Sequence, residues 1–124
     1  MTTDIKVVIP AQPRFLRIAR LTVAGLAGEV GFGLRDIEDL RVAIDEMCAV
    51  VIEDADPGLE LALVYRVDGT RIEIEGSCGQ KGAPPDIHPV ARELLAMTAD
   101  EFQLDGDDGG RTFRLVKHRT DPTD

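Results

Sequence analysis

The stretch from residue 59 to residue 77 constrains the fold most, because it alternates apolar and polar residues around an Asp-Gly turn signal. The segments "LELALVYRV" and "RIEIEGS" flank the turn "DGT". Alternation with period two on both sides of such a turn is typical of a β-hairpin with one buried face. We therefore predict a hairpin here, and other elements of the chain must cover its apolar face.

Helical spacing of apolar residues occurs in three other stretches. Steps of three and four run from residue 13 to 30, where "GFG" stops the pattern, and again from Ile37 to Ile52, before Pro57 and Gly58. The same spacing returns from 88 to 100, with Pro89 in a first-turn position. These stretches predict three helices, the second beginning after Asp36.

Strand patterns complete the chain at both ends. "IKVVI" (5–9) is a β-branched run closed by proline, and "EFQLD" (101–105) and "RTFRLVKH" (111–118) flank the turn "GDDGG". The predicted order is β-α-α-β-β-α-β-β. It favours an α/β fold of two layers, an α+β sandwich with a mixed, largely antiparallel sheet and helices on one face. We expect one domain over 1–118 and a tail over 119–124, since 124 residues that are 44% hydrophobic suffice for one core.

The net charge limits the classes of molecule that the protein is expected to bind. A formal net charge of −9 opposes binding to a phosphate backbone and favours a basic partner. There is no apolar run of membrane-spanning length, and "MTTDIKVVIP" lacks the pattern of a signal peptide. We therefore expect a cytoplasmic protein that contacts neither nucleic acid nor membrane.

The cysteines and histidines give no sign of a metal or redox centre. Cys48 and Cys78 form no CxxC pattern, so we interpret both as structural thiols. His88 and His118 have no acid or cysteine at ligand spacing, so no metal is expected. The glycines of "GSCGQKG" (76–82) suit either a flexible connection or a loop presenting N–H groups to phosphate.

An adjacent acid pair, Asp45 and Glu46, interrupts the apolar pattern of the second helix. Helical steps of four place Glu46 on one stripe with Val42 and Val50, at the edge of the core-facing positions. A carboxylate there can act as a general base or orient water, or it can simply stay solvated. Asp45 points further outward, and we predict no role for it.

Arg14, Arg17 and Arg20 follow one another at steps of three on the first helix of a strongly acidic chain. Arginine binds carboxylates through a bidentate fork, so this row is a candidate surface for recognising another protein. The alternative is that the three side chains balance acids of the chain itself, such as Glu29 or Asp36.

Three stretches resemble the anti-sigma factor serine kinases of the RsbW and sporulation type, within the histidine-kinase and Hsp90-like (GHKL) ATPase superfamily. They are "FLRIARLTVAGLAGEVGF", "DIEDLRVAIDEMCAVVIE" and "ADEFQLDGDDGGRTFRLVKH". The resemblance spans nearly the whole chain and implies a Bergerat-like ATPase fold. In that fold a mixed sheet carries helices on one face, and nucleotide is held between helices and a mobile lid.

The resemblance carries the nucleotide site over only in part. Glu46 falls on the glutamate of the Glu-x-x-x-Asn box, which implies a catalytic role, but Val50 stands where the box has its Mg²⁺-binding Asn. "EGSCG" offers Glu75 for the adenine-binding Asp of Asp-x-Gly-x-Gly and Gly79 for one of its glycines. If the alignment is shifted by one residue, Gly76 occupies the position of the Asp instead. No glycine occurs between Ala83 and Gly106, where the family's phosphate-binding Gly-x-Gly belongs. These departures imply a degenerate site for Mg-ATP.

The resemblance also implies partners. A family arginine that contacts both the sigma factor and the anti-anti-sigma factor matches Arg20, with Arg17 beside it and Arg14 nearer the helix start. We expect a homodimeric anti-sigma regulatory factor that sequesters a sigma factor without normal kinase activity. The alternative is an active ATP-dependent kinase that phosphorylates an anti-anti-sigma factor on serine.

Overall fold

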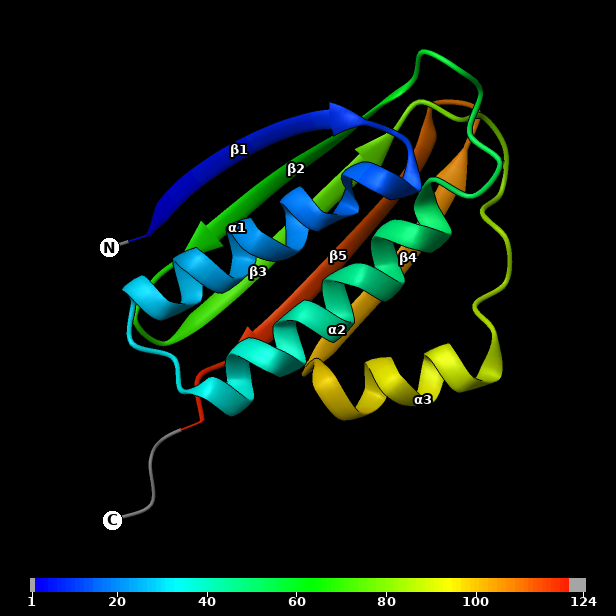
Figure 1. Cartoon of the computed structure of the whole chain (residues 1–124). Helices are drawn as coiled ribbons and strands as arrows, with labels where there is room; N and C mark the ends of the chain where they lie inside the picture. Colours follow the sequence, from blue (N-terminus) through cyan, green and yellow to red (C-terminus); the bar gives the residue numbers. More distant parts are fainter. Residues whose placement is uncertain (1, 121–124) are drawn as a thin grey trace.

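The chain folds in the predicted order of strands and helices (Figure 1). The computed structural model describes residues 2–120. The strands are β1 (Thr3–Pro10), β2 (Glu60–Val67), β3 (Arg71–Cys78), β4 (Glu101–Asp107) and β5 (Gly110–His118). The helices are α1 (Leu16–Glu29), preceded by a 3₁₀ turn (Pro13–Phe15), α2 (Leu34–Val51) and α3 (Pro89–Thr98).

The five strands form one sheet in the order β1-β2-β3-β5-β4. Both predicted hairpins are present, β2 with β3 and β4 with β5. The second hairpin is tighter than expected, because its strands extend to Asp107 and from Gly110 across most of the "GDDGG" turn. Every pairing is antiparallel, so the sheet contains none of the parallel pairing that a mixed sheet allows.

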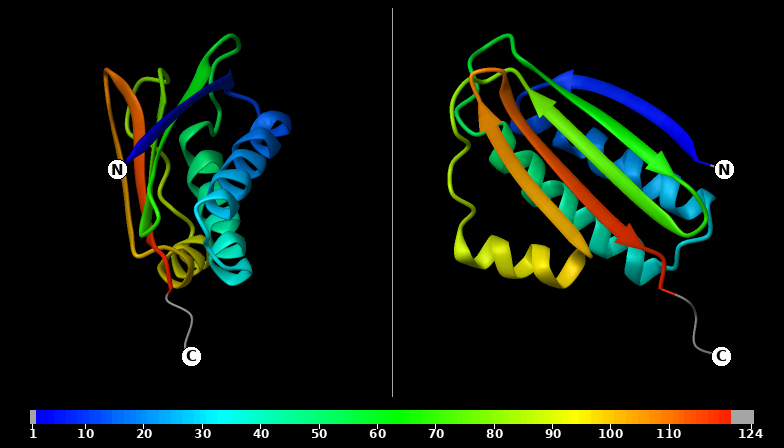
Figure 2. Two further views of the ribbon diagram at one scale, coloured as in Figure 1. Left: turned by 90° about the vertical axis from the view of Figure 1, so that its left-hand side faces the viewer. Right: turned by 180° about the vertical axis from the view of Figure 1, so that it is seen from behind.

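Two layers make up the molecule, as the side view in Figure 2 shows. Helices α1 and α2 lie side by side over one face of the sheet, and α3 contacts α2 and the edge strand β4. The other face, which we call the open face, carries no helix. The expected two-layer sandwich with helices on one face is therefore confirmed.

The core lies between the sheet and helices α1 and α2, and the predicted apolar stripes supply it. The buried helical residues are Leu16, Ala19, Val23 and Ala27 of α1 and Leu40, Ala43, Ile44, Met47, Cys48 and Val51 of α2. Tyr65 of β2 is fully buried beneath them, and its hydroxyl donates a hydrogen bond to the carbonyl of Ala19 at 3.1 Å. Because a buried hydroxyl needs such a partner, this bond fixes α1 on the sheet.

Helix α2 begins earlier than its apolar pattern predicts. Gly33 precedes the first turn, and Asp36, expected just before the helix, lies within that turn. The Asp36 carboxylate is buried and accepts hydrogen bonds at 2.8 Å from both the backbone N–H and the hydroxyl of Thr120. An acid in a first turn also interacts favourably with the positive end of the helix dipole.

The end of β5 continues into residues that bond to the domain. Arg119 donates its backbone N–H to the carbonyl of Thr70 at 2.7 Å, and Thr120 is held by Asp36. The first two residues of the expected tail thus belong to the domain, and residues 121–124 lie outside the described part. None of the helices within residues 2–120 is long and apolar enough to cross a membrane.

A glycine is required at position 76 of β3, because Phe113 on the neighbouring strand fills the space that a side chain would occupy. It pairs with Phe113 of β5, and a Cβ at residue 76 would lie 2.1 Å from the phenyl ring. Such a separation is far inside van der Waals contact. The absence of a side chain at 76 therefore makes room for a buried aromatic ring.

Candidate functional site

A hollow of about 990 Å³ lies where α2 ends. Its walls come from the start of α1, the last turns of α2 and the segment that leads into α3. We call it the α2-end hollow. Its apolar lining includes Leu16, Val50, Ile52, Ala55, Pro85 and Ile87. A concave, mainly apolar volume of this size is typical of a ligand site.

Glu46 lies in the wall of this hollow. Its side chain is half-buried, as the stripe at the edge of the core predicted, and Val50 lines the same wall one turn later. Within residues 2–120 Glu46 forms no ion pair. The arrangement therefore presents a carboxylate to the hollow beside a hydrocarbon side chain that has no oxygen to offer a metal ion.

Three further carboxylates line the hollow, Glu53, Asp54 and Asp86. Asp54 is the only non-glycine residue with positive φ in the described chain, at 54°. No lysine or arginine is among the described lining residues. Sequence reasoning missed this cluster, although its signal is visible in "IEDAD", where acids follow the helix end without a basic residue.

Arg111 of β5 fixes the end of α2 from beneath. Its side chain is buried, and Nη1 donates to the carbonyl oxygens of Val51 at 3.3 Å and Glu53 at 2.7 Å. The Val51 carbonyl is one that a helix leaves unsatisfied at its C-terminus, and the Glu53 carbonyl belongs to the turn that follows. The guanidinium thereby positions the backbone that carries the acids of the hollow.

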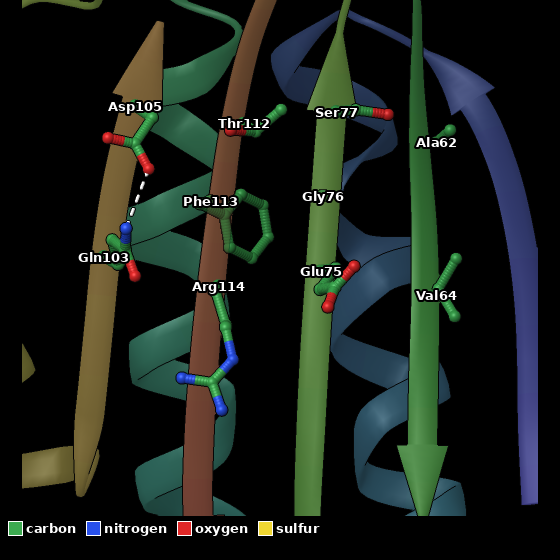
Figure 3. A pocket seen from close by; sticks show the side chains of 10 residues that line it. All are labelled: Ala62, Val64, Glu75, Gly76, Ser77, Gln103, Asp105, Thr112, Phe113 and Arg114. Atoms are coloured by element: carbon green, nitrogen blue, oxygen red, sulfur yellow. Dashed lines mark hydrogen bonds between the residues drawn. The ribbon is translucent and has the colours of Figure 1, made fainter.

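The structure places Glu75 on the opposite side of the sheet from this hollow. Glu75 points to the open face, where its Oε1 lies 2.8 Å from Nη1 of Arg66. Figure 3 shows it among the residues of a shallow open-face pocket of about 360 Å³. Gly79 lies just beyond β3 and lines neither space. The structure thus does not bring Glu75 or Gly79 together with Glu46. Glu75 lies on the other side of the sheet, because successive residues of a strand point to opposite faces, and Gly79 lies beyond the end of the strand.

The open face carries an ion-pair network centred on Glu73. Its carboxylate lies 2.8 Å from Arg114, 3.0 Å from Arg66 and 3.1 Å from Arg71. Burial alone would raise the pKa of Glu73, but hydrogen bonds from Arg114 and Arg66 and the charges of Arg114 and Arg71 outweigh it, so its pKa is lowered. Charged side chains on the open face thus pair with one another within the protein.

The three arginines of the first helix have different surroundings. Nη1 of Arg20 lies 2.8 Å from Oδ1 of Asp45 on α2, and both side chains are partly exposed. Arg14 lies over the ring of Phe15, 4.7 Å from its centroid. Arg17 is exposed and has no ion pair within residues 2–120. Arg20 is therefore balanced internally, by Asp45, for which we predicted no role, and not by the predicted Glu29 or Asp36.

Apolar side chains lie exposed on α1 beside these arginines. Leu21 is 63% exposed and Ile18 is 40% exposed. Both follow Arg14 and Arg17 at helical spacing, so they share the outward side of the helix. The result is a surface of mixed basic and apolar character on an acidic protein, and we call it the α1 surface (Arg14, Arg17, Ile18, Arg20 and Leu21).

Fold and site together define a class of protein: an antiparallel sheet with helices on one face and an acid-bearing helix beside a hollow, as in GHKL-type ATPase domains. Comparison of whole folds supports this class. A crystal structure of RsbU and RsbW domains from Mycobacterium tuberculosis superposes with a TM-score of 0.72 over 98% of this chain and 34% of that chain, at 19% identity.

Sequence relatives identify the family more closely. Two proteins called serine-protein kinase RsbW, from Bacillus thuringiensis (strain Al Hakam) and Bacillus cereus (strain 03BB102), are each 41% identical over 93 residues. The matched part is 73% of this chain and 56% of either relative, so the chain spans little more than half their length. No family model matches the chain. The chain belongs with the RsbW-type proteins and has a GHKL-type fold.

Proposed function

We propose that this protein is an anti-sigma regulatory factor that works by contact. It binds a sigma factor through the α1 surface, and an anti-anti-sigma factor competes for the same surface and releases the sigma factor. The observation that carries this proposal is the contrast between the α2-end hollow, whose lining does not suit Mg-ATP, and the exposed basic and apolar α1 surface.

The lining of the hollow does not fit Mg-ATP. Val50 has no oxygen for Mg²⁺, and the described lining offers the phosphates four carboxylates and no lysine or arginine. Phosphoryl transfer depends on positioning and on neutralising phosphate charge. We therefore propose that regulation proceeds without a kinase step by this chain.

The α1 surface suits a protein partner. Exposed Leu21 and Ile18 supply apolar contact area, and Arg17 has its guanidinium available for a carboxylate. Arg20 can exchange its exposed pair with Asp45 for a partner carboxylate at small cost, because such pairs contribute only about 0–1 kcal/mol. The partner face we expect is acidic with an apolar centre.

The test is a titration of the protein against the purified sigma factors of its own organism, with and without Mg-ATP. A single sigma factor should bind equally well in both conditions. Arg17→Ala and Arg20→Ala should weaken the complex at least tenfold, while Glu46→Ala leaves it unchanged. Arg41→Ala is the matched control, because Arg41 forms a similar exposed pair, with Glu38 at 2.9 Å.

Two results would contradict the proposal. If no sigma factor binds under either condition, the protein has another kind of partner. If Arg41→Ala weakens the complex as much as Arg20→Ala does, the contact surface is not on α1.

The alternative function is an ATP-dependent protein-serine kinase, as the names of the relatives suggest. The position of Glu46 in the wall of the hollow favours it, because a general base must face the reacting groups. Calorimetric titration with Mg-ATP and Mg-ADP decides between the two functions. Saturable binding together with phosphate transfer to a small anti-anti-sigma domain would establish the kinase, and a flat trace supports regulation by contact.

A further inference from the structure

The α2-end hollow combines an apolar floor with an acidic rim. Val50, Ala55 and Pro85 come from three separate segments, are partly exposed, and form apolar surface that a ligand would cover. Glu46, Glu53, Asp54 and Asp86 supply the rim. A ligand that fills this space therefore removes apolar surface from water and meets several negative charges.

The backbone adds to the negative potential. The hollow lies at the C-terminal end of α2, where the helix dipole places partial negative charge. The last turn of α2 contains no basic residue. Arg111 satisfies two carbonyls there, but it lies beneath the helix end and is not part of the lining. The end of α2 and the carboxylates therefore both make the electrostatic potential inside the hollow more negative.

The chemistry of the rim selects an organic cation over a metal ion. Within residues 2–120, no group of three or more His, Cys, Asp or Glu side chains is arranged to hold a metal ion. The carboxylates come from α2, from the turn after it and from the segment before α3. Carboxylates spread over three segments suit ammonium or guanidinium groups carried at intervals along a polypeptide.

From these observations we propose that the α2-end hollow binds a basic, apolar segment of another polypeptide, with leucine-like side chains on its floor and lysine or arginine on its rim. This inference goes beyond the sigma-factor contact at α1 and does not depend on it.

The test uses three fluorescein-labelled hexapeptides on the unchanged protein, read by anisotropy. The first has lysine, two leucines and arginine between glycines; in the second, glutamates replace the basic residues, and in the third, serines replace the leucines. The first should bind saturably, weaken with rising salt and shift the amide signals of Ile52, Ala55 and Ile87 in an NMR titration. The other two should bind at least tenfold more weakly.

Charge-neutral variants sharpen the test. Glu46→Gln/Glu53→Gln should weaken the first peptide at least tenfold, whereas Glu29→Gln/Glu38→Gln, which removes the same charge elsewhere, should change it less than twofold. Equal binding of all three peptides, or NMR shifts centred on Ile18 and Leu21 of α1, would overturn the proposal. The peptide series needs no variant, so a misfolded variant does not weaken the test.

Discussion

The two ends of helix α2 hold their carboxylates in opposite ways. At the N-terminal end, Asp36 accepts two hydrogen bonds from Thr120, and Lys117 lies 3.2 Å from Asp39 and 3.8 Å from Asp36. At the C-terminal end, Glu46 and Glu53 face a hollow whose described lining contains His88 but no lysine or arginine. Within the described residues, the carboxylates at the N-terminal end have hydrogen-bond donors or a lysine as partners, whereas no lysine or arginine pairs with those at the C-terminal end.

This difference separates stability from binding within a single helix. A buried, hydrogen-bonded carboxylate at the positive end of a helix dipole stabilises the fold. Carboxylates beyond the negative end oppose it, so their presence is better explained by a ligand than by stability. The comparison predicts that removing an acid changes stability with opposite sign at the two ends.

Asp36→Ala should have the largest effect. It removes both bonds to Thr120 and leaves the buried Lys117 with only Asp39, so we expect a loss of about 2–3 kcal/mol in the free energy of unfolding. Urea denaturation measures it. Glu38→Ala, on the exposed side of the same helix, is the control, and a loss as small as the control's would remove the distinction between the ends.

The thiol of Cys48 lies between the two ends of α2, and its rate of alkylation should reveal the loss of stability caused by Asp36→Ala. Burial, with a smaller contribution from the charge of Asp45, raises the pKa of this thiol far above its ordinary value. Alkylation of native Cys48 therefore requires opening of the core. In a Cys78→Ala background, Asp36→Ala should accelerate alkylation roughly 30- to 150-fold, the equivalent of its stability loss.

Neutralising Glu53 should leave that alkylation rate within twofold of the parent protein's. Acceleration by Glu53→Gln comparable to that of Asp36→Ala would mean that both ends of α2 govern the opening of its core.

Arg111→Met tests how the Arg111 side chain fixes the C-terminal end of α2. It preserves most of the side-chain volume but removes the bonds to the carbonyls of Val51 and Glu53, so we expect a loss of about 1–2 kcal/mol. Hydrogen exchange should quicken at Ile52 and Glu53 and stay unchanged at Ile37. Uniform acceleration along α2 would show that Arg111 supports the whole helix and not its end.

Glu53→Gln should have the smallest effect, with the opposite sign. Because it removes a negative charge near the negative end of the helix dipole, we expect a gain of roughly 0.3–0.5 kcal/mol, visible as a higher midpoint in urea. A destabilisation would mean that Glu53 has a structural partner and that the two ends of α2 are more alike than the comparison holds.

The sequence was sufficient for most of the fold, because the signals involved are local. Period-two alternation located the hairpin of β2 and β3, and strand patterns that flank a turn located the hairpin of β4 and β5. Steps of three and four located the buried stripes of α1 and α2. The start of α2 was placed late, because Gly33 and Leu34 lie outside the apolar pattern.

The candidate site could be predicted only in part, because it depends on contacts between distant residues. The pair between Arg20 and Asp45 joins residues 25 apart, and Arg111 reaches a carbonyl 60 residues away. Glu75 is instructive, since the alternation of "RIEIEGS" already indicated that Ile74 points inward and Glu75 outward. The family motif suggests Glu75 for a nucleotide site, whereas the alternation of its strand places it on the open face.

The contact between Gly76 and Phe113 has a consequence for the history of the family. A side chain at 76 can be accommodated only if the ring at 113 becomes smaller, so the two positions form one steric unit shared by two strands. Across related sequences they should covary: glycine at 76 with an aromatic residue at 113, and a larger residue at 76 with a small one at 113. Retention of this glycine across related sequences would then record a packing constraint between two strands.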